Sequence, residues 1–104
     1  MTVEGLGRFA DPAVLILSSL AGGPKHGYAL VKDVEQFAGV RLGPGTLYGA
    51  LGRLESRGLV EALDAEERRR PYRLTADGAA ALRSYLEHAG AVARTGLGRL
   101  AAGT

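Results

Sequence analysis

Residues 41–60, RLGPGTLYGALGRLESRGLV, predict one helix followed directly by a strand. Pro44 suits the first helical turn, where a missing backbone N–H breaks no hydrogen bond, and Gly43 takes the N-cap position before it. The apolar face of this helix recurs at helical spacing and comprises Leu47, Leu51 and Leu54. Gly58 then supplies the left-handed residue that commonly ends a helix.

The opposite face of this central helix carries little side-chain bulk. It comprises Thr46, Gly49, Arg53 and Ser56. Each interior glycine costs a helix about 1 kcal/mol relative to alanine. A helix with such glycines either packs very close to another surface or needs close access to one, and a helix lying in a DNA groove would meet that need. An ordinary amphipathic core helix is the alternative on this stretch alone.

Two helices precede the central one. Asp11 and Pro12, a capping carboxylate followed by proline, predict the start of a helix that runs through residues 13–21 and is apolar nearly all round. A second helix is predicted over residues 27–38, and a short connector over residues 40–42 leads to the central helix. This succession matches a helix-turn-helix.

Two short strands and a long helix are predicted after the central helix. The strands cover residues 59–63 and 71–75 and are separated by a charged turn, DAEERRR, at residues 64–70. A hairpin wing beside a helix-turn-helix predicts a winged helix-turn-helix, a mainly α fold with a small β component. Thr75 can cap the last helix, which is predicted to reach Leu100 and to be marginal in its second half.

The small and apolar residues of the last helix alternate at spacings of three and four, which is a heptad pattern. They are Ala79, Leu82, Leu86, Ala89, Ala93, Gly96 and Leu100. Because small residues let helices approach closely, this pattern favours a homodimer; a helix that folds back onto its own domain is the alternative. The predicted organisation is a flexible arm at 1–10, a winged-helix domain at 11–75 and a dimerisation helix at 76–104.

Composition limits the classes of function. The chain has 104 residues, 46% of them hydrophobic, which suits one small folded domain. It has no Cys, so disulfides and thiolate metal sites are excluded. The net charge of +2 is too small to indicate nucleic acid by itself, so the placement of the charges decides. The longest apolar run, residues 13–17, is too short to span a bilayer, and we expect a cytoplasmic protein.

No catalytic arrangement is found in the sequence. The two imidazoles, His26 and His88, fall on different predicted elements, and no group of residues has the spacing of metal ligands. Asp64, Glu66 and Glu67 lie beside arginines in a turn, where solvated ion pairs are the simpler explanation. We therefore expect no enzyme activity, no cofactor and no metal.

The basic residues gather where a winged helix meets DNA. Three arginines crowd the tip of the predicted hairpin, and arginine donates hydrogen bonds in a fork that suits phosphate oxygens. A solvated charged surface is the alternative, and Tyr48 suits a wedge against the second helix equally well. The candidate DNA-binding residues are Lys25, His26, Tyr28, Thr46, Tyr48, Gly49, Arg53, Arg68, Arg69, Arg70 and Arg73.

Three motifs carry a resemblance to a known family. PKHGYAL at residues 24–30, GPGTLYGALGRLESRGLV at 43–60 and RRRPYRLTADG at 68–78 together resemble the PadR family of transcriptional regulators. The residues that match the family motifs are His26, Gly27 and Tyr28 (HGY), Gly45 to Tyr48 (GTLY), Arg68 to Arg70 (the basic wing) and Tyr72, Leu74, Thr75 and Gly78. The short region after residue 85 is similar to small members with a single C-terminal helix.

The resemblance implies a winged-helix repressor of palindromic operator DNA, with a dimer built from the first and last helices. The interface residues it suggests are Val14, Leu17, Leu82, Leu86, Ala89 and Ala93. In some members a small phenolic or drug-like effector relieves repression. Two departures stand out: Gly49 replaces a frequent Pro, and the chain has no Trp, so the indole sandwich that holds flat drugs in some small members cannot form.

We therefore expect a homodimeric repressor that binds double-stranded DNA at an inverted repeat, with the central helix in the major groove and the wing on the backbone or minor groove. Two alternatives remain. One is a winged helix that binds other proteins and not specific DNA. The other is a ligand-sensing regulator whose effector site lies at the dimer interface.

Overall fold

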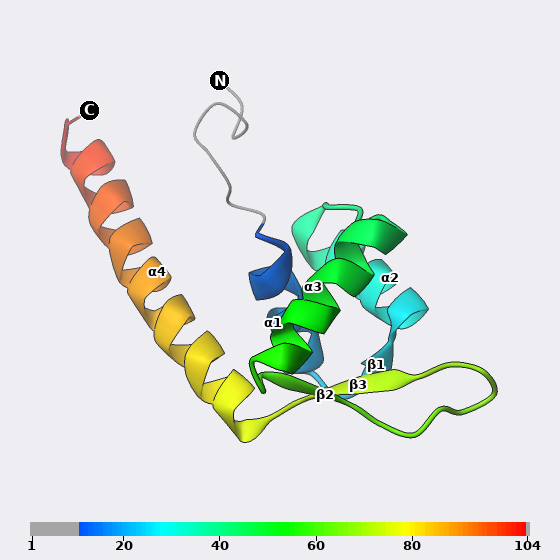
Figure 1. Cartoon of the computed structure of the whole chain (residues 1–104). Coiled ribbons are helices and arrows are strands. Elements are labelled where there is room, and N and C mark those ends of the chain that lie inside the picture. Colours follow the sequence, from blue (N-terminus) through cyan, green and yellow to red (C-terminus); the bar gives the residue numbers. More distant parts are fainter. Residues whose placement is uncertain (1–10, 104) are drawn as a thin grey trace.

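The computed structural model describes residues 11–103, so the arm predicted at residues 1–10 lies outside the described residues. Its helices are α1 (Pro12–Leu20), α2 (Gly27–Ala38), α3 (Pro44–Ser56) and α4 (Ala76–Gly103). Its strands are β1 (Lys25–His26), β2 (Val60–Ala62) and β3 (Pro71–Leu74). In Figure 1 the first three helices form one body, the sheet lies along one side of it, and α4 leads away from it.

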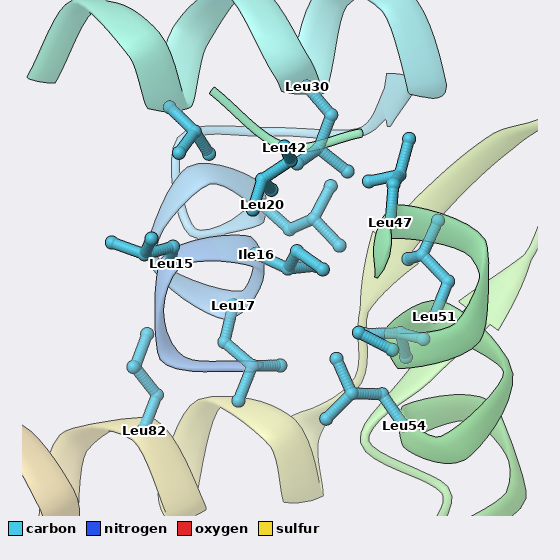
Figure 2. Packing of buried hydrophobic residues seen from close by; sticks show 13 residues of the cluster. Leu15, Ile16, Leu17, Leu20, Leu30, Leu42, Leu47, Leu51, Leu54 and Leu82 are labelled. Atoms are coloured by element: carbon cyan, nitrogen blue, oxygen red, sulfur yellow. The ribbon is translucent and has the colours of Figure 1, made fainter. Parts of the chain in front are cut away.

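An aliphatic core joins the three N-terminal helices to the sheet. Ile16, Leu30 and Leu51 come from three different helices, and their side chains are almost completely inaccessible to solvent. Leu82 adds the first turns of α4 to this core (Figure 2). Burial of one such side chain contributes about 1.5–3 kcal/mol, which explains how a chain with few aromatic residues forms a stable centre.

The helix boundaries follow the capping residues. Asp11 accepts a hydrogen bond from the backbone N–H of Ala13 at 2.9 Å, and Pro44 opens α3 directly after Gly43. Gly58, with φ of 74°, ends α3 as predicted. In α2 the side chains of Leu30 and Val34 are buried, whereas Phe37, about one turn further along, is 51% exposed.

The sheet has one strand more than the predicted hairpin. Its order is β1-β3-β2, with both pairs antiparallel. In β1, Lys25 pairs with Tyr72 and His26 pairs with Pro71. A strand of two residues is too short to show an alternation of apolar and polar residues, so no local pattern predicts it. The extra strand brings the N-terminus of α2 beside the wing.

A tight junction connects the end of α3 to the start of α4. Thr75 donates its hydroxyl hydrogen bond to the carbonyl of Gly58 at 2.7 Å and accepts one from the N–H of Gly78 at 2.9 Å. A Cβ added to Gly78 would lie 2.0 Å from the carbonyl oxygen of Leu59. Glycine is therefore required where α4 meets this backbone, and α4 continues unbroken to Gly103, past the region predicted to be marginal.

Candidate nucleic-acid interface

A hollow of about 280 Å³ lies between the start of α2, the side of α3 and the wing. Here we define the wing as residues 60–74, which form β2, β3 and the loop between them. The residues that line the hollow are His26, Gly27, Tyr28, Tyr48, Arg68, Arg69, Arg70 and Tyr72. Six of the eleven candidate DNA-binding residues therefore meet at one place, although they come from three separate segments of the sequence.

The wing tip is a tight turn in an unusual conformation. Glu66 and Arg69 exchange two backbone hydrogen bonds, of 2.6 and 2.8 Å. The two residues between them, Glu67 and Arg68, have φ values of 47° and 70°. Two successive left-handed residues define a type I′ turn, which Asn and Gly normally fill, so both side chains here adopt a sparsely populated conformation. The turn places Glu67 and Arg68 together at the tip of the wing.

The register of the wing shifts by one residue below its tip. The pairing of β2 with β3 matches Val60 with Leu74 and Ala62 with Tyr72, whereas the bridge at the tip matches Glu66 with Arg69. The first strand thus carries one residue more than its partner between these points. Such a bulge bends a hairpin and increases its twist.

His26 connects the wing to the start of α2. Its Nδ1 accepts a hydrogen bond from the backbone N–H of Ala29 at 3.4 Å and so caps the helix. Its Nε2 lies 3.4 Å from Nη1 of Arg69. A neutral ring that accepts at Nδ1 carries its proton on Nε2, so both groups at the second contact are then donors. An anion between these two donors would accept from both.

Two tyrosines flank the start of α2. Tyr48 leans from α3 across Gly27: a Cβ on Gly27 would lie 2.4 Å from the Tyr48 hydroxyl oxygen. The wedge against the second helix is thus present, while the side chain stays 55% exposed. Tyr28 is 62% exposed, and the ammonium of Lys32 lies 5.4 Å from its ring centroid.

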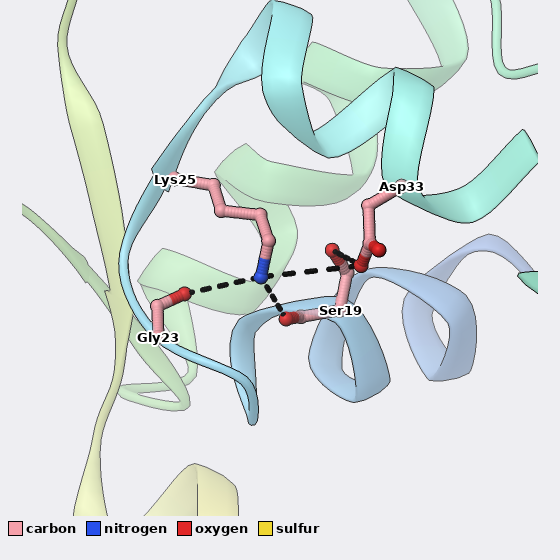
Figure 3. Close-up of polar contacts among 4 residues, drawn as sticks. All are labelled: Ser19, Gly23, Lys25 and Asp33. Atoms are coloured by element: carbon pink, nitrogen blue, oxygen red, sulfur yellow. Dashed lines mark hydrogen bonds and ion pairs between the residues drawn. The ribbon is translucent and has the colours of Figure 1, made fainter. Parts of the chain in front are cut away.

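Lys25 lies apart from the other basic candidates. Its ammonium donates a hydrogen bond to the carbonyl of Ser19 at 2.5 Å and a longer one to that of Gly23 at 3.4 Å (Figure 3). The carboxylate of Asp33 lies 3.9 Å from it and accepts a hydrogen bond from the Ser19 hydroxyl at 2.6 Å. Lys25 therefore closes the C-terminal end of α1, where a cation is favourable, and is not brought into the hollow.

The remaining candidate DNA-binding residues differ in whether their side chains already interact with other parts of the protein. Arg73 forms an ion pair with Glu61 across the strands, and Arg70 donates to the carbonyl of Leu63 at 3.4 Å. Thr46 and Arg53 lie on the exposed side of α3, beside a second and larger hollow between this helix and the start of α1. Gly49 lies between them on the same exposed side.

Tyr72 was not among the DNA-binding residues predicted from the sequence. It lines the first hollow because β3 pairs with β1, which sets its ring beside the start of α2. The motif that contains Tyr72 is visible in the sequence, but its position depends on a strand pairing with no local signal.

The residues predicted at a dimer interface divide into two groups. Leu17 and Leu82, each 6% exposed, are already buried in the core of their own chain, and Val14 is partly buried. Leu86, at 45% exposed, and Ala93 lie along the outward side of α4, with Ala89 partly covered.

Residues 11–103 contain neither a candidate metal centre nor a candidate membrane span. No group of three or more His, Cys, Asp or Glu residues in this range could hold a metal ion. No helix in the same range is long and apolar enough to cross a membrane.

The sequence from α1 to the first turns of α4 matches a known family. The model of the transcriptional regulator PadR-like family covers residues 16–84. The chain belongs to this family. The winged helix-turn-helix predicted from the sequence is confirmed, and PadR-like proteins are regulators of transcription that bind DNA and are not enzymes.

Relatives of this PadR-like chain include an uncharacterized 37.1 kDa protein in transposon TN4556 of Streptomyces fradiae. The two are 52% identical over 71 residues, which is 68% of this chain and 21% of the relative, so the chain spans about a fifth of that protein's length. A PadR family transcription regulator from Clostridium difficile is 28% identical, with a TM-score of 0.74 over 81% of this chain and 92% of that one. A PadR family regulator from Eggerthella lenta is 37% identical, with a TM-score of 0.69 over 85% and 79%.

Proposed function

We propose that this protein is a homodimeric transcriptional repressor that binds an inverted-repeat operator. The observation that carries the proposal is the hollow between α2, α3 and the wing, in which arginine, histidine and tyrosine side chains from three segments meet. Phosphate oxygens accept hydrogen bonds from all of these donors, and such contacts set the position and orientation of a protein on a duplex.

The backbone phosphate has a defined place in this proposal. It would lie between Arg69 and His26, where it would accept from both and relieve their donor-to-donor contact. The Tyr48 hydroxyl, beside Gly27, would donate to the same strand. Arg68, at the tip of the type I′ turn, would reach the neighbouring minor groove or backbone, while α3 enters the major groove.

The homodimer rests on the apolar stripe of α4, which we define as the exposed side chains Leu86, Leu97 and Leu100. A protein with two-fold symmetry binds half-sites whose centres lie about 34 Å, or a multiple of this, apart. In this proposal repression follows from occupation of the operator, and the cytoplasm is the place of action. An effector that regulates the protein would have to bind the DNA-competent and incompetent states with different affinity.

The test is a fluorescence anisotropy titration against DNA from upstream of the protein's own gene, with unrelated duplex as competitor and several salt concentrations. If each subunit neutralises about four phosphates, the slope of log K against log salt is about −7. Arg68→Ala with Arg69→Ala should weaken binding to all sequences and make the slope less steep by roughly 0.9 for each phosphate that is no longer neutralised. A slope near zero would contradict phosphate-driven binding and favour the protein-interaction alternative.

A further inference from the structure

We propose that Arg53 is the principal base-reading side chain of α3 and that it recognises a guanine in each half-site. This inference rests on the proposed function, since it assigns one residue's part in DNA recognition. It begins from the exposed side of α3, which faces away from the core residues Leu47, Ala50, Leu51 and Leu54.

Most of this exposed side cannot read a base. Gly45, Gly49 and Gly52 are exposed and have no side chain to present. The hydroxyl of Ser56 donates to the carbonyl of Gly52 at 2.9 Å and is occupied within the helix. Glycines at these positions let the helix backbone approach the floor of a groove closely, but sequence is read by side-chain contacts to base edges.

Few longer side chains remain on this helix. Tyr48 is directed toward Gly27 at the start of α2 and so toward the wing hollow. Thr46 is exposed but short, and Glu55 carries a negative charge that the phosphates of a duplex repel. Arg53 combines an exposed position with reach and with a rigid fork of donors.

The guanidinium of Arg53 is directed toward the N-terminal half of α3. A Cβ built on Gly49 would lie 3.5 Å from Nη1 of Arg53, so the side chain extends back along the helix by about one turn. In a helix-turn-helix the N-terminal part of the recognition helix makes the base contacts. A Cβ at Gly49 would touch the guanidinium only at ordinary van der Waals distance, so this position does not obstruct the arginine.

Within the described part of the chain the guanidinium of Arg53 also has no ion-pair partner. Among residues 11–103 the ion pairs are Lys25 with Asp33 and Arg73 with Glu61, and neither includes Arg53. Arg57, one turn further along, lines the same large hollow and lies at the C-cap of α3, away from the base-reading end. Arginine that donates to O6 and N7 of guanine is the commonest specific contact in the major groove.

The experiment measures wild-type, Arg53→Ala, Arg53→Lys and Arg57→Ala proteins against a set of operators in which each base pair is changed in turn. Arg53→Ala should lose discrimination at one guanine-containing base pair per half-site by about 5- to 150-fold, with the preference at other positions kept. Arg53→Lys should lose part of this discrimination while the salt slope stays unchanged. Arg57→Ala should leave the preference at every position unchanged.

Two results would overturn the assignment of Arg53. One is an unchanged preference at every base pair in Arg53→Ala. The other is a uniform loss on all sequences with a salt slope less steep by roughly 0.9 per subunit, which would make Arg53 a phosphate contact. A wild-type protein with no operator preference would instead contradict the proposed function itself. Circular dichroism spectra that match the wild type confirm that each variant is folded.

Discussion

The two halves of α4 have the same local structure but opposite surroundings. The first turns are held by the chain itself: Gly78 is buried against backbone, and Leu82 is 6% exposed in the core. In the second half, by contrast, Leu97 and Leu100 are 69% and 68% exposed. The first half of the helix therefore completes one domain, and the second half leads away from it (Figure 1). Within residues 11–103 its leucines form an apolar stripe that is left exposed. Burial of such a stripe against a second copy is the proposed use of the outer half.

The largest expected effect comes from a substitution in the first turns of α4, the half that belongs to the core. Gly78→Ala would place a methyl group 2.0 Å from the carbonyl oxygen of Leu59 and 2.9 Å from Cδ1 of Leu74. Backbone cannot move aside as a flexible side chain can, so we expect a loss of about 3 kcal/mol in the free energy of unfolding. Urea denaturation followed by circular dichroism measures it.

The control for Gly78→Ala is Gly52→Ala. Nothing lies within 4 Å of a Cβ on Gly52, which is an exposed helical position. This variant should gain up to about 1 kcal/mol in stability. Equal stability of both variants would show that Gly78 does not define the junction.

The second-largest expected effect comes from substitutions in the second, outer half of α4. Leu97→Glu with Leu100→Glu places four charges in the proposed homodimer interface and removes apolar area worth about 1.5–3 kcal/mol for each leucine. We expect the dimer dissociation constant to rise at least 100-fold (roughly, since the costs of several leucines add). Sedimentation velocity measures this, and the thermal unfolding of the monomer should stay cooperative.

A matched double variant tests whether the position of the added charges on α4 matters or only their presence. Ala91→Glu with Thr95→Glu adds the same charge to exposed residues on the other side of α4. This protein should remain a dimer. Dissociation of both variants alike would mean that charge on α4, and not loss of the apolar stripe, causes it.

The elements that the sequence predicted well are those with local signals. The bounds of α2 and α3 follow from glycine and proline at their ends, and the heptad pattern of α4 follows from spacing alone. The basic wing is likewise predicted from local signals in the sequence. These features need only a residue and its near neighbours, so a single sequence contains them.

The features that sequence reasoning missed depend on distant contacts. β1 forms because residues 25–26 meet β3, more than forty residues later. The same folding turns Lys25 toward the end of α1, although its sequence position beside His26 suggested a shared DNA-binding role. The type I′ turn at Glu67 and Arg68 was hidden because neither residue is typical of that conformation.

The smallest expected effect distinguishes two sides of the outer half of α4. Gly96 belongs to the predicted heptad positions, whereas Gly98 falls away from them, and nothing lies within 4 Å of a Cβ on either. Alanine favours the helix at both positions by about 1 kcal/mol. If the stripe packs against a second copy, Gly96→Ala also adds a methyl group where the two helices approach closely, so its dimer should dissociate about 5-fold more readily than that of Gly98→Ala. Sedimentation equilibrium on both variants provides the two dissociation constants. Equal values would place Gly96 outside the contact and would shift the interface toward the side of α4 that carries Leu86 and Leu97, which are 45% and 69% exposed.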